Sequence, residues 1–157
     1  MWRVLLLVLA AALIYAAWSG RGGETAQVKR VIDANTLEIE RDGQVMPVRL
    51  WGECGAVQGV FAIRAKDLLD KLLFKNCPDQ GQVKIIPMGT DQDGNLMVRA
   101  SACGKDLGLA LVDEGFARVD SGHMAWYQGL RYLLGQFMVK MANNGVWGEQ
   151  DAVPACP

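Results

Sequence analysis

Residues 28–52 read VKRVIDANTLEIERDGQVMPVRLWG, a stretch in which apolar and polar residues alternate. The alternation is interrupted twice by turn-forming residues, at Asp33-Ala34-Asn35 and at Asp42-Gly43. A period of two is typical of strands that bury one face, and Asp-Gly is a frequent hairpin turn. The stretch therefore predicts three short antiparallel strands that follow one another in a meander.

Downstream of this meander, helical and strand patterns alternate. Residues 59–76 place apolar side chains at helical spacing and charged side chains on the opposite face, which predicts an amphipathic helix. Residues 83–104 predict two more strands around an Asp-Gln-Asp-Gly turn, and residues 105–115 predict a short helix that ends at a glycine. Residues 125–142 predict a third helix. The domain is thus expected to contain five strands and three helices.

The composition limits the classes of protein to which the chain can belong. With 157 residues, of which 51% are hydrophobic, it is long enough for one compact domain with a core and too short for two. Its 16 Lys and Arg residues are balanced by 17 Asp and Glu residues. Because nucleic-acid partners usually require a basic face, the overall charge does not support binding to nucleic acid.

The N-terminal residues are typical of a targeting segment. Arg3 is followed by an uncharged run from Val4 to Trp18 and then by the sequence SGRGGET. The run is shorter than the ~20 apolar residues of a typical membrane span, so it is either a signal peptide cleaved after Ser19 or a retained membrane anchor. In both cases residues 20–157 lie outside the cytoplasm, in the periplasm or secreted. In the second case the segment anchors them in the inner membrane.

The cysteine pattern agrees with export. The chain has four cysteines, at positions Cys54, Cys77, Cys103 and Cys156. An even number in an exported chain predicts two disulfides, with three connectivities open. No two of the cysteines are close in sequence and the only histidine is His123, whereas structural zinc sites usually have paired ligands at short spacing. The pattern therefore argues against a zinc site.

The order of the predicted elements and several short motifs resemble the staphylococcal nuclease-like (thermonuclease-like) family. The matching segments are VIDANTLEI, VRLWG, the DQDGN turn, GKDLGLALVDEGFARV and the closing NNGVW. The resemblance implies an α+β fold in which a five-stranded OB-type β-barrel carries three helices, here preceded by the N-terminal hydrophobic signal or anchor helix. It divides the chain into the signal peptide or anchor (1–19), a linker (20–26), the nuclease-like domain (27–149) and a C-terminal tail (150–157).

In that family a calcium ion polarises a phosphodiester, a glutamate helps to activate water, and two arginines stabilise the developing charge. The resemblance assigns Arg49 to the first of these arginines, which is retained. Four other positions are replaced: Asn35 and Cys54 stand where calcium ligands are expected, Val57 where the glutamate is expected, and Asn95 where the second arginine is expected. The active site implied by the resemblance is therefore degenerate.

These replacements predict that the chain is not a calcium-dependent nuclease. Loss of one positioned charge from such a site commonly costs ~100-fold to ~1000-fold in rate. Calcium takes about six to eight oxygen ligands, which an amide and a thiol do not supply, so no cofactor is expected. Calcium enters only if the chain is a divergent nuclease, in which Glu53 replaces a lost carboxylate and converges with Asp33 and Arg49. Without its partners, Arg49 can equally be a structural residue.

The resemblance also bears on the cysteine pairing. In the family's barrel the start of the fourth strand lies beside the end of the fifth, which are the regions of Cys77 and Cys103. A disulfide between these two is therefore implied. The remaining pair is Cys54 and Cys156, and a bond between them folds the C-terminal tail back over the former substrate cleft.

Three hypotheses for the function follow. The leading one is a catalytically inactive thermonuclease-like domain that acts outside the cytoplasm as a binding or structural module of an envelope assembly. Its expected partners are envelope proteins, and the membrane through the N-terminal segment if that segment is not cleaved. The alternatives are a divergent secreted or membrane-anchored nuclease with a rearranged site, and an OB-type binder of oligonucleotides or oligosaccharides.

Overall fold

The computed structural model describes residues 23–124, 126–149, 152–154 and 156 of the chain. The segment predicted to be a signal peptide or anchor lies outside the described residues. The first strand, β1 (Glu24–Val31), begins within the stretch that the sequence predicted as a linker. The difference has a simple cause, because Glu24 already pairs with Ile85 of the neighbouring strand and Ala26 is buried.

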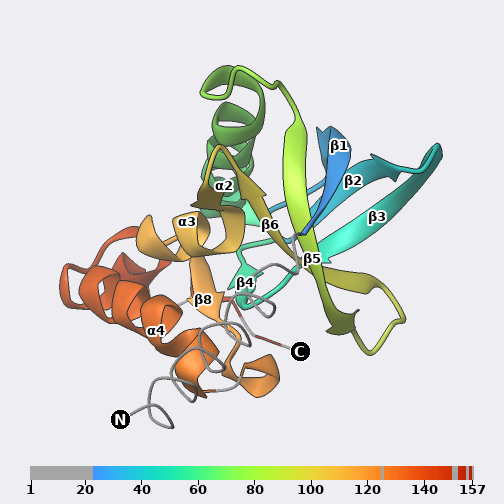
Figure 1. Cartoon of the computed structure of the whole chain (residues 1–157). Coiled ribbons are helices and arrows are strands. Elements are labelled where there is room, and N and C mark those ends of the chain that lie inside the picture. Colours follow the sequence, from blue (N-terminus) through green and yellow to red (C-terminus); the bar gives the residue numbers. More distant parts are fainter. Residues whose placement is uncertain (1–22, 125, 150–151, 155, 157) are drawn as a thin grey trace, which may run out of the picture.

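Five strands close into a β-barrel (Figure 1). They are β1, β2 (Thr36–Arg41), β3 (Gln44–Leu50), β5 (Gln82–Thr90) and β6 (Leu96–Ala102). Neighbours pair antiparallel in the order β3-β2-β1-β5-β6, and a parallel pairing between β3 and β6 closes the sheet. With the three α-helices described below, this arrangement confirms the predicted α+β fold with a five-stranded barrel.

Alternation along the strands places apolar side chains inside the barrel. Leu37 and Ile39 of β2 are fully buried. In β3, Val48 is fully buried and Leu50 is 2% exposed. Arg49 lies between two of these inward-facing residues, so its side chain points to the outside of the barrel. The pattern that predicted the meander therefore also sets the direction in which Arg49 points.

Three α-helices flank the barrel: α2 (Gly59–Asp70), α3 (Leu107–Asp113) and α4 (Trp126–Met141). A π-helix, η1 (Lys71–Lys75), continues α2. The carboxylate of Asp106 caps α3 by accepting a hydrogen bond from the backbone N–H of Leu109 at 3.1 Å. Helix α4 lies beside α3 on the side away from the barrel (Figure 1). In the part of the chain that the structure describes, no helix is both long and apolar enough to cross a membrane.

Several short elements were not predicted from the sequence. Strands β4 (Glu53–Gly55) and β8 (Ala117–Val119) form a separate two-stranded sheet. Strand β7 (Lys105–Asp106) pairs with the end of β6, so the helix that was predicted from residue 105 begins only at Leu107. Two 3-10 helices, η2 (Ser121–His123) and η3 (Gly145–Gly148), follow β8 and α4, respectively. The β4–β8 sheet is the most important of these elements, because it carries Cys54.

Two disulfides cross-link the fold, Cys77–Cys103 and Cys54–Cys156. These are the two pairs expected from the sequence. Their Cα atoms are 5.9 Å and 5.5 Å apart, respectively, within the usual range for a disulfide. Two disulfides in a chain of this size fit an oxidising, extracytoplasmic compartment.

Candidate functional site

A cavity of about 600 Å³ lies on the outer side of the barrel, between β3, the β5–β6 turn, β4 and part of the C-terminal tail. The residues that matter for its chemistry are Asn35, Arg49, Cys54, Gly55, Val57, Asp91, Asp93, Asn95 and the tail residues Ala152, Val153 and Pro154. All five positions that the sequence analysis singled out as retained or replaced catalytic positions line this one cavity. The fold thus brings these five positions together at one cavity.

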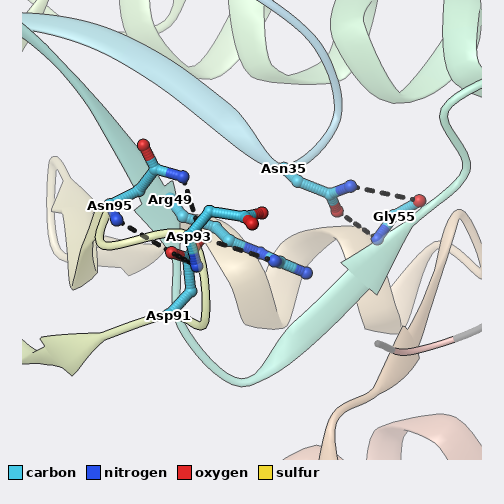
Figure 2. A network of polar contacts seen from close by, with 6 residues as sticks. All are labelled: Asn35, Arg49, Gly55, Asp91, Asp93 and Asn95. Carbon is cyan, nitrogen blue, oxygen red and sulfur yellow. Dashed lines mark hydrogen bonds and ion pairs between the residues drawn. The ribbon is translucent and has the colours of Figure 1, made fainter.

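Arg49 is held against Asp91 at the cavity wall (Figure 2). Its Nη1 atom lies 3.6 Å from Oδ2 of Asp91, and the side chain of Arg49 is 21% exposed. Asp93, in the same turn as Asp91, adds a second carboxylate to the lining, while Arg49 is the one basic residue among the described residues that line the cavity. The wall therefore offers a paired positive charge, and two carboxylates beside it, to an incoming ligand.

Asn95 stabilises the turn that carries Asp91. Its Nδ2 donates a hydrogen bond to Oδ2 of Asp91 at 3.1 Å, and its backbone N–H donates to Oδ1 at 2.8 Å. The backbone N–H of Asp93 also donates to Oδ1, at 3.0 Å. The side-chain bond from Asn95 is the main cause that lowers the pKa of Asp91, and the charge of Arg49 lowers it further. Asn95 therefore helps to hold the carboxylate with which Arg49 pairs.

Asn35 has a comparable structural role on the opposite side of the cavity (Figure 2). Its Oδ1 accepts a hydrogen bond from the backbone N–H of Gly55, and its Nδ2 donates to the carbonyl of Gly55 at 3.4 Å. Its own backbone N–H is held by Oδ1 of Asp33 at 2.8 Å. Because a carboxylate has no donor for the Gly55 carbonyl, an amide fits this position better than the aspartate that a calcium site requires.

Cys54 and Val57 supply neither a ligand nor a base to the cavity. The side chain of Cys54 is buried and bonded to Cys156. That bond draws the tail toward the cavity, where Ala152, Val153 and Pro154 form part of the wall. Val57 is 61% exposed at the rim and presents only methyl groups. This side of the cavity is therefore largely apolar.

Glu53 does not take the place of a lost carboxylate. It is 1% exposed, it does not line the cavity, and neither of its carboxyl oxygens has a hydrogen-bond partner among the described residues. Burial raises the pKa of Glu53 well above its usual range; the nearby charge of Arg49 lowers it, and that of Asp33 raises it. A buried carboxyl that does not reach the cavity neither activates water nor holds calcium there.

One group of potential metal ligands lies close to the cavity. Atoms of Cys54, Asp120 and Cys156 all fall within 4.8 Å of one another. The two sulfur atoms are bonded to each other and so are not thiolate ligands. Asp120 accepts a hydrogen bond from the backbone N–H of Gly122 at 3.1 Å. The two cysteines therefore form a cross-link, and Asp120 stabilises the turn beside it.

The position of the tail agrees with the sequence prediction, because the Cys54–Cys156 bond brings Ala152, Val153 and Pro154 into the cavity wall. Sequence reasoning missed one feature of the site, the burial of Glu53, which could have been predicted. Successive residues of a strand point to opposite sides, so an expectation that Cys54 faces the cavity implies that Glu53 points away from it.

Comparison of the sequence with protein-family models gives no matching family, and comparison with curated proteins gives no matching protein.

Proposed function

We propose that the chain is a catalytically inactive thermonuclease-like domain that acts outside the cytoplasm as a binding or structural module of an envelope assembly. The resemblance of its motifs to the staphylococcal nuclease-like family supports the first part, and the two disulfides support the location. One observation carries the proposal: Arg49 lies against Asp91, in a cavity whose replaced positions hold structural amides, a disulfide and an apolar side chain. Such a cavity can bind a ligand, and none of its four replaced positions offers a group that activates water.

The chemistry of the cavity favours a ligand of low net charge. Its charged lining residues, Arg49, Asp91 and Asp93, sum to one negative charge (+1 − 2 = −1). A polyanion such as an oligonucleotide meets two carboxylates here, which weakens binding. A peptide segment suits the wall better, because the apolar rim at Val57 and Val153 accepts aliphatic side chains and the ion pair offers a donor and an acceptor to the backbone. We therefore propose that the cavity binds a segment of a protein partner that has low net charge and carries aliphatic side chains.

Catalysis is tested by cleavage of fluorescent single-stranded DNA with and without calcium, in the full chain and in the variant Arg49→Ala. We expect no cleavage above the blank in any arm, because loss of one positioned charge already costs ~100-fold to ~1000-fold and four positions are replaced. Calcium-dependent cleavage that disappears in Arg49→Ala overturns the assignment as inactive. Glu53 gives no support to that outcome, since its carboxyl does not line the cavity.

Binding is tested by recovery of protein partners from envelope fractions with two matched variants. Val57→Glu places a charge on the cavity rim, whereas Ile63→Glu places one on the exposed side of α2; the two native residues are 61% and 64% exposed. We expect a partner that is retained by the native chain and by Ile63→Glu but lost from Val57→Glu. A partner retained equally by all three chains binds elsewhere and contradicts the proposed role of the cavity. Release of the partner by a neutral oligosaccharide assigns the cavity to a carbohydrate instead.

A further inference from the structure

The carboxylate of Asp120 lies beside the disulfide that holds the C-terminal tail. One of its oxygens and the sulfur atoms of Cys54 and Cys156 all lie within 4.8 Å of one another. Asp120 is 8% exposed and Cys54 is 2% exposed, so solvent and salt screen the interaction between the charge and the sulfurs only weakly. The backbone N–H of Gly122 donates to Oδ1 of Asp120 at 3.1 Å, which helps to fix the carboxylate in this position. A negative charge is thus built in beside this disulfide.

The second disulfide has different surroundings. Among the described residues, no carboxylate or imidazole forms a comparable group with Cys77 and Cys103. The charged residues within two positions of these cysteines are Lys75, Asp79 and Lys105, and all three are exposed. Solvent and salt screen exposed charges strongly. The molecule therefore contains two disulfides that differ in the charge beside them, and one can serve as the reference for the other.

The rate of thiol–disulfide exchange depends on such a charge. A thiolate attacks one sulfur of the disulfide, and the electron pair of the broken S–S bond leaves on the other sulfur. Cys156 is half-buried and Cys54 is buried, so the attack falls on Cys156 and Cys54 leaves. A second thiol then releases Cys156, so that two thiols end as one disulfide and the chain gains two thiols. Negative charge thus develops on sulfur atoms that lie within 4.8 Å of the Asp120 carboxylate.

We propose that Asp120 protects the Cys54–Cys156 bond from attack by thiolates, so that the tail stays at the cavity wall under conditions that reduce Cys77–Cys103. Two like unit charges about 4 Å apart repel each other enough to slow such a step about fivefold even in bulk water. The effect is larger where the charge is buried. This inference concerns the wall of the cavity and is independent of what the cavity binds.

The bond matters for the cavity because the other contacts of the tail are weak. The backbone N–H of Ala152 donates to the carbonyl of Glu149 at 2.9 Å, a contact within the last residues of the chain. The side chains of Ala152 and Val153 pack against the small apolar cluster that contains Phe61 and Val146. Small apolar side chains bury little surface, so opening of the disulfide frees this segment to leave the wall. Protection of the bond therefore keeps the cavity bounded.

A cation on the same side of the β4–β8 sheet has the opposite effect. Arg118 is paired with Cys54, and directly opposed residues of an antiparallel pair point to the same side. Arg118 is exposed, so solvent and salt screen its charge more than that of the buried Asp120. We therefore expect the carboxylate to dominate, and Arg118 offers a control variant in which the change of charge has the opposite sign.

The test measures the reduction of both disulfides in the full chain by cysteamine, 2-mercaptoethanol and 2-mercaptoethanesulfonate. These thiols are similar in size, and their thiolate forms are neutral overall, singly negative and doubly negative, respectively. Rates are taken per thiolate at pH 8, where the imidazole of a histidine is ordinarily uncharged. Free thiols are blocked with iodoacetamide at intervals, and peptide mapping quantifies each disulfide. Each rate for Cys54–Cys156 is divided by the rate for Cys77–Cys103 in the same sample.

We expect this ratio to fall about fivefold or more from cysteamine to 2-mercaptoethanesulfonate. Asp120→Asn, whose amide oxygen can still accept from Gly122, should abolish the fall, whereas Asp120→Glu should retain most of it. Arg118→Gln should make the fall slightly steeper.

Protection by burial alone gives a different result. A ratio that is low but equal for the three thiols shows that access, and not charge, protects the bond, and it overturns the inference. A fall that persists unchanged in Asp120→Asn assigns the effect to another charge and also overturns it. Should Asp120→Asn fail to form both disulfides, the series on the native chain and on Asp120→Glu and Arg118→Gln still decides, because a flat ratio in the native chain is sufficient to reject the role of Asp120.

Discussion

The Nη1 atom of Arg49 and the Oδ2 atom of Asp91 lie 3.6 Å apart at the cavity wall. The carboxylate in this pair is itself held by Asn95, which donates to the same oxygen at 3.1 Å. The sequence resemblance assigns positions 49 and 95 to catalytic arginines. The residues at both positions contact Asp91, Arg49 through an ion pair and Asn95 through a hydrogen bond. The pair keeps the Arg49 guanidinium from acting as an isolated phosphate-binding cation.

Release of Arg49 from its partner should increase the affinity of the cavity for a polyanion. In Asp91→Asn the amide oxygen still accepts the backbone hydrogen bonds of the turn, but the charge that neutralises Arg49 is gone. Asp93→Asn removes the same charge from the same turn without unpairing Arg49 and serves as the control. We expect tighter binding of single-stranded DNA by Asp91→Asn than by Asp93→Asn, with a salt slope steeper by about 0.7. Fluorescence anisotropy over a salt series measures both; equal affinities would show that the ion pair does not restrain Arg49.

Introduction of a carboxylate at position 35 should weaken the fold without creating a calcium site. Asn35→Asp removes the donor for the Gly55 carbonyl and places a negative charge against it, which we expect to lower the free energy of unfolding by about 1–3 kcal/mol. Urea denaturation gives the stability, and isothermal titration with calcium gives the affinity. The control Asn35→Ala removes the same donor without adding a charge. Calcium binding by Asn35→Asp would contradict the structural role assigned to this amide.

The stability of the protein should fall as the pH rises above the pKa of an unfolded glutamate, about 4.3, because of Glu53. Burial raises the pKa of Glu53 in the folded state, so folding takes up a proton between the unfolded and the folded pKa values. The stability contribution is complete below the unfolded pKa and is lost as the pH rises toward the folded pKa. Glu53→Gln cannot titrate and should remove this slope.

A second substitution at position 53 measures how much the buried carboxyl lowers the free energy of unfolding. Glu53→Leu replaces a carboxyl whose oxygens have no hydrogen-bond partner among the described residues with an apolar side chain. We expect it to stabilise the protein at pH 7 by about 1–3 kcal/mol. Denaturant unfolding of both variants and the native chain from pH 4 to pH 8 tests the two statements together. Identical pH profiles for the native chain and Glu53→Gln would mean that Glu53 is ionised in the folded protein.

Truncation of Asp106 should lower the free energy of unfolding more than truncation of Tyr132. The Tyr132 hydroxyl donates to Asp106 at 2.7 Å, and burial raises the pKa of Tyr132 above its usual range. In Tyr132→Phe, Asp106 keeps its bonds to Leu109 and Arg99, so we expect a loss of about 1 kcal/mol. Asp106→Ala removes the cap of α3 and leaves the hydroxyl buried without its acceptor, so we expect about 2–4 kcal/mol. Chemical denaturation checks the ratio, and equal losses would show that the hydroxyl is the main partner of Asp106.

The two disulfides should contribute differently to stability because they close loops of different length. Their sequence separations are 102 for Cys54–Cys156 and 26 for Cys77–Cys103. In the chain-entropy model these loops correspond to about 4.7 and about 3.5 kcal/mol. The paired variants Cys54→Ser/Cys156→Ser and Cys77→Ser/Cys103→Ser, each compared with the native chain under oxidising conditions, measure both. A larger loss for the shorter loop would indicate that native packing, and not chain entropy, governs the difference.

The long-range plan of the fold could be predicted from the sequence because the strands and helices have strong periodicity. The alternation around Leu37, Ile39 and Val48 specifies strands with one buried face, and the turn residues between them set their order. Strands β4 and β8 were missed because each has only three residues and exists only through its pairing with the other. No local pattern marks a pairing between segments so far apart in the chain.

The candidate site could be predicted in position but not in chemistry. The resemblance brought Asn35, Arg49 and Asn95 to one cavity, and the structure places them there. The structural role of Asn35 depends on backbone groups of Gly55, which lies 20 residues away in the chain. That of Asn95 depends on the side chain of Asp91, which lies 4 residues away. Those contacts arise from the turn geometry and from the β4–β8 sheet. A comparison of charges with the family's motif therefore does not reveal the structural roles of the two asparagines.

The long disulfide also imposes a sequence of events on the maturation of the domain. Cys77 can pair with Cys103 once a stretch of 26 residues has emerged, but Cys54 must wait for a partner 102 positions further along. During that interval Cys54 is an unpaired thiol in a chain with two other cysteines, and any wrong pair must be corrected by thiol–disulfide exchange. The tail is thus the last part of the cavity wall to be fixed, and a chain caught early in its biogenesis presents an open cleft where the mature protein has a bounded one.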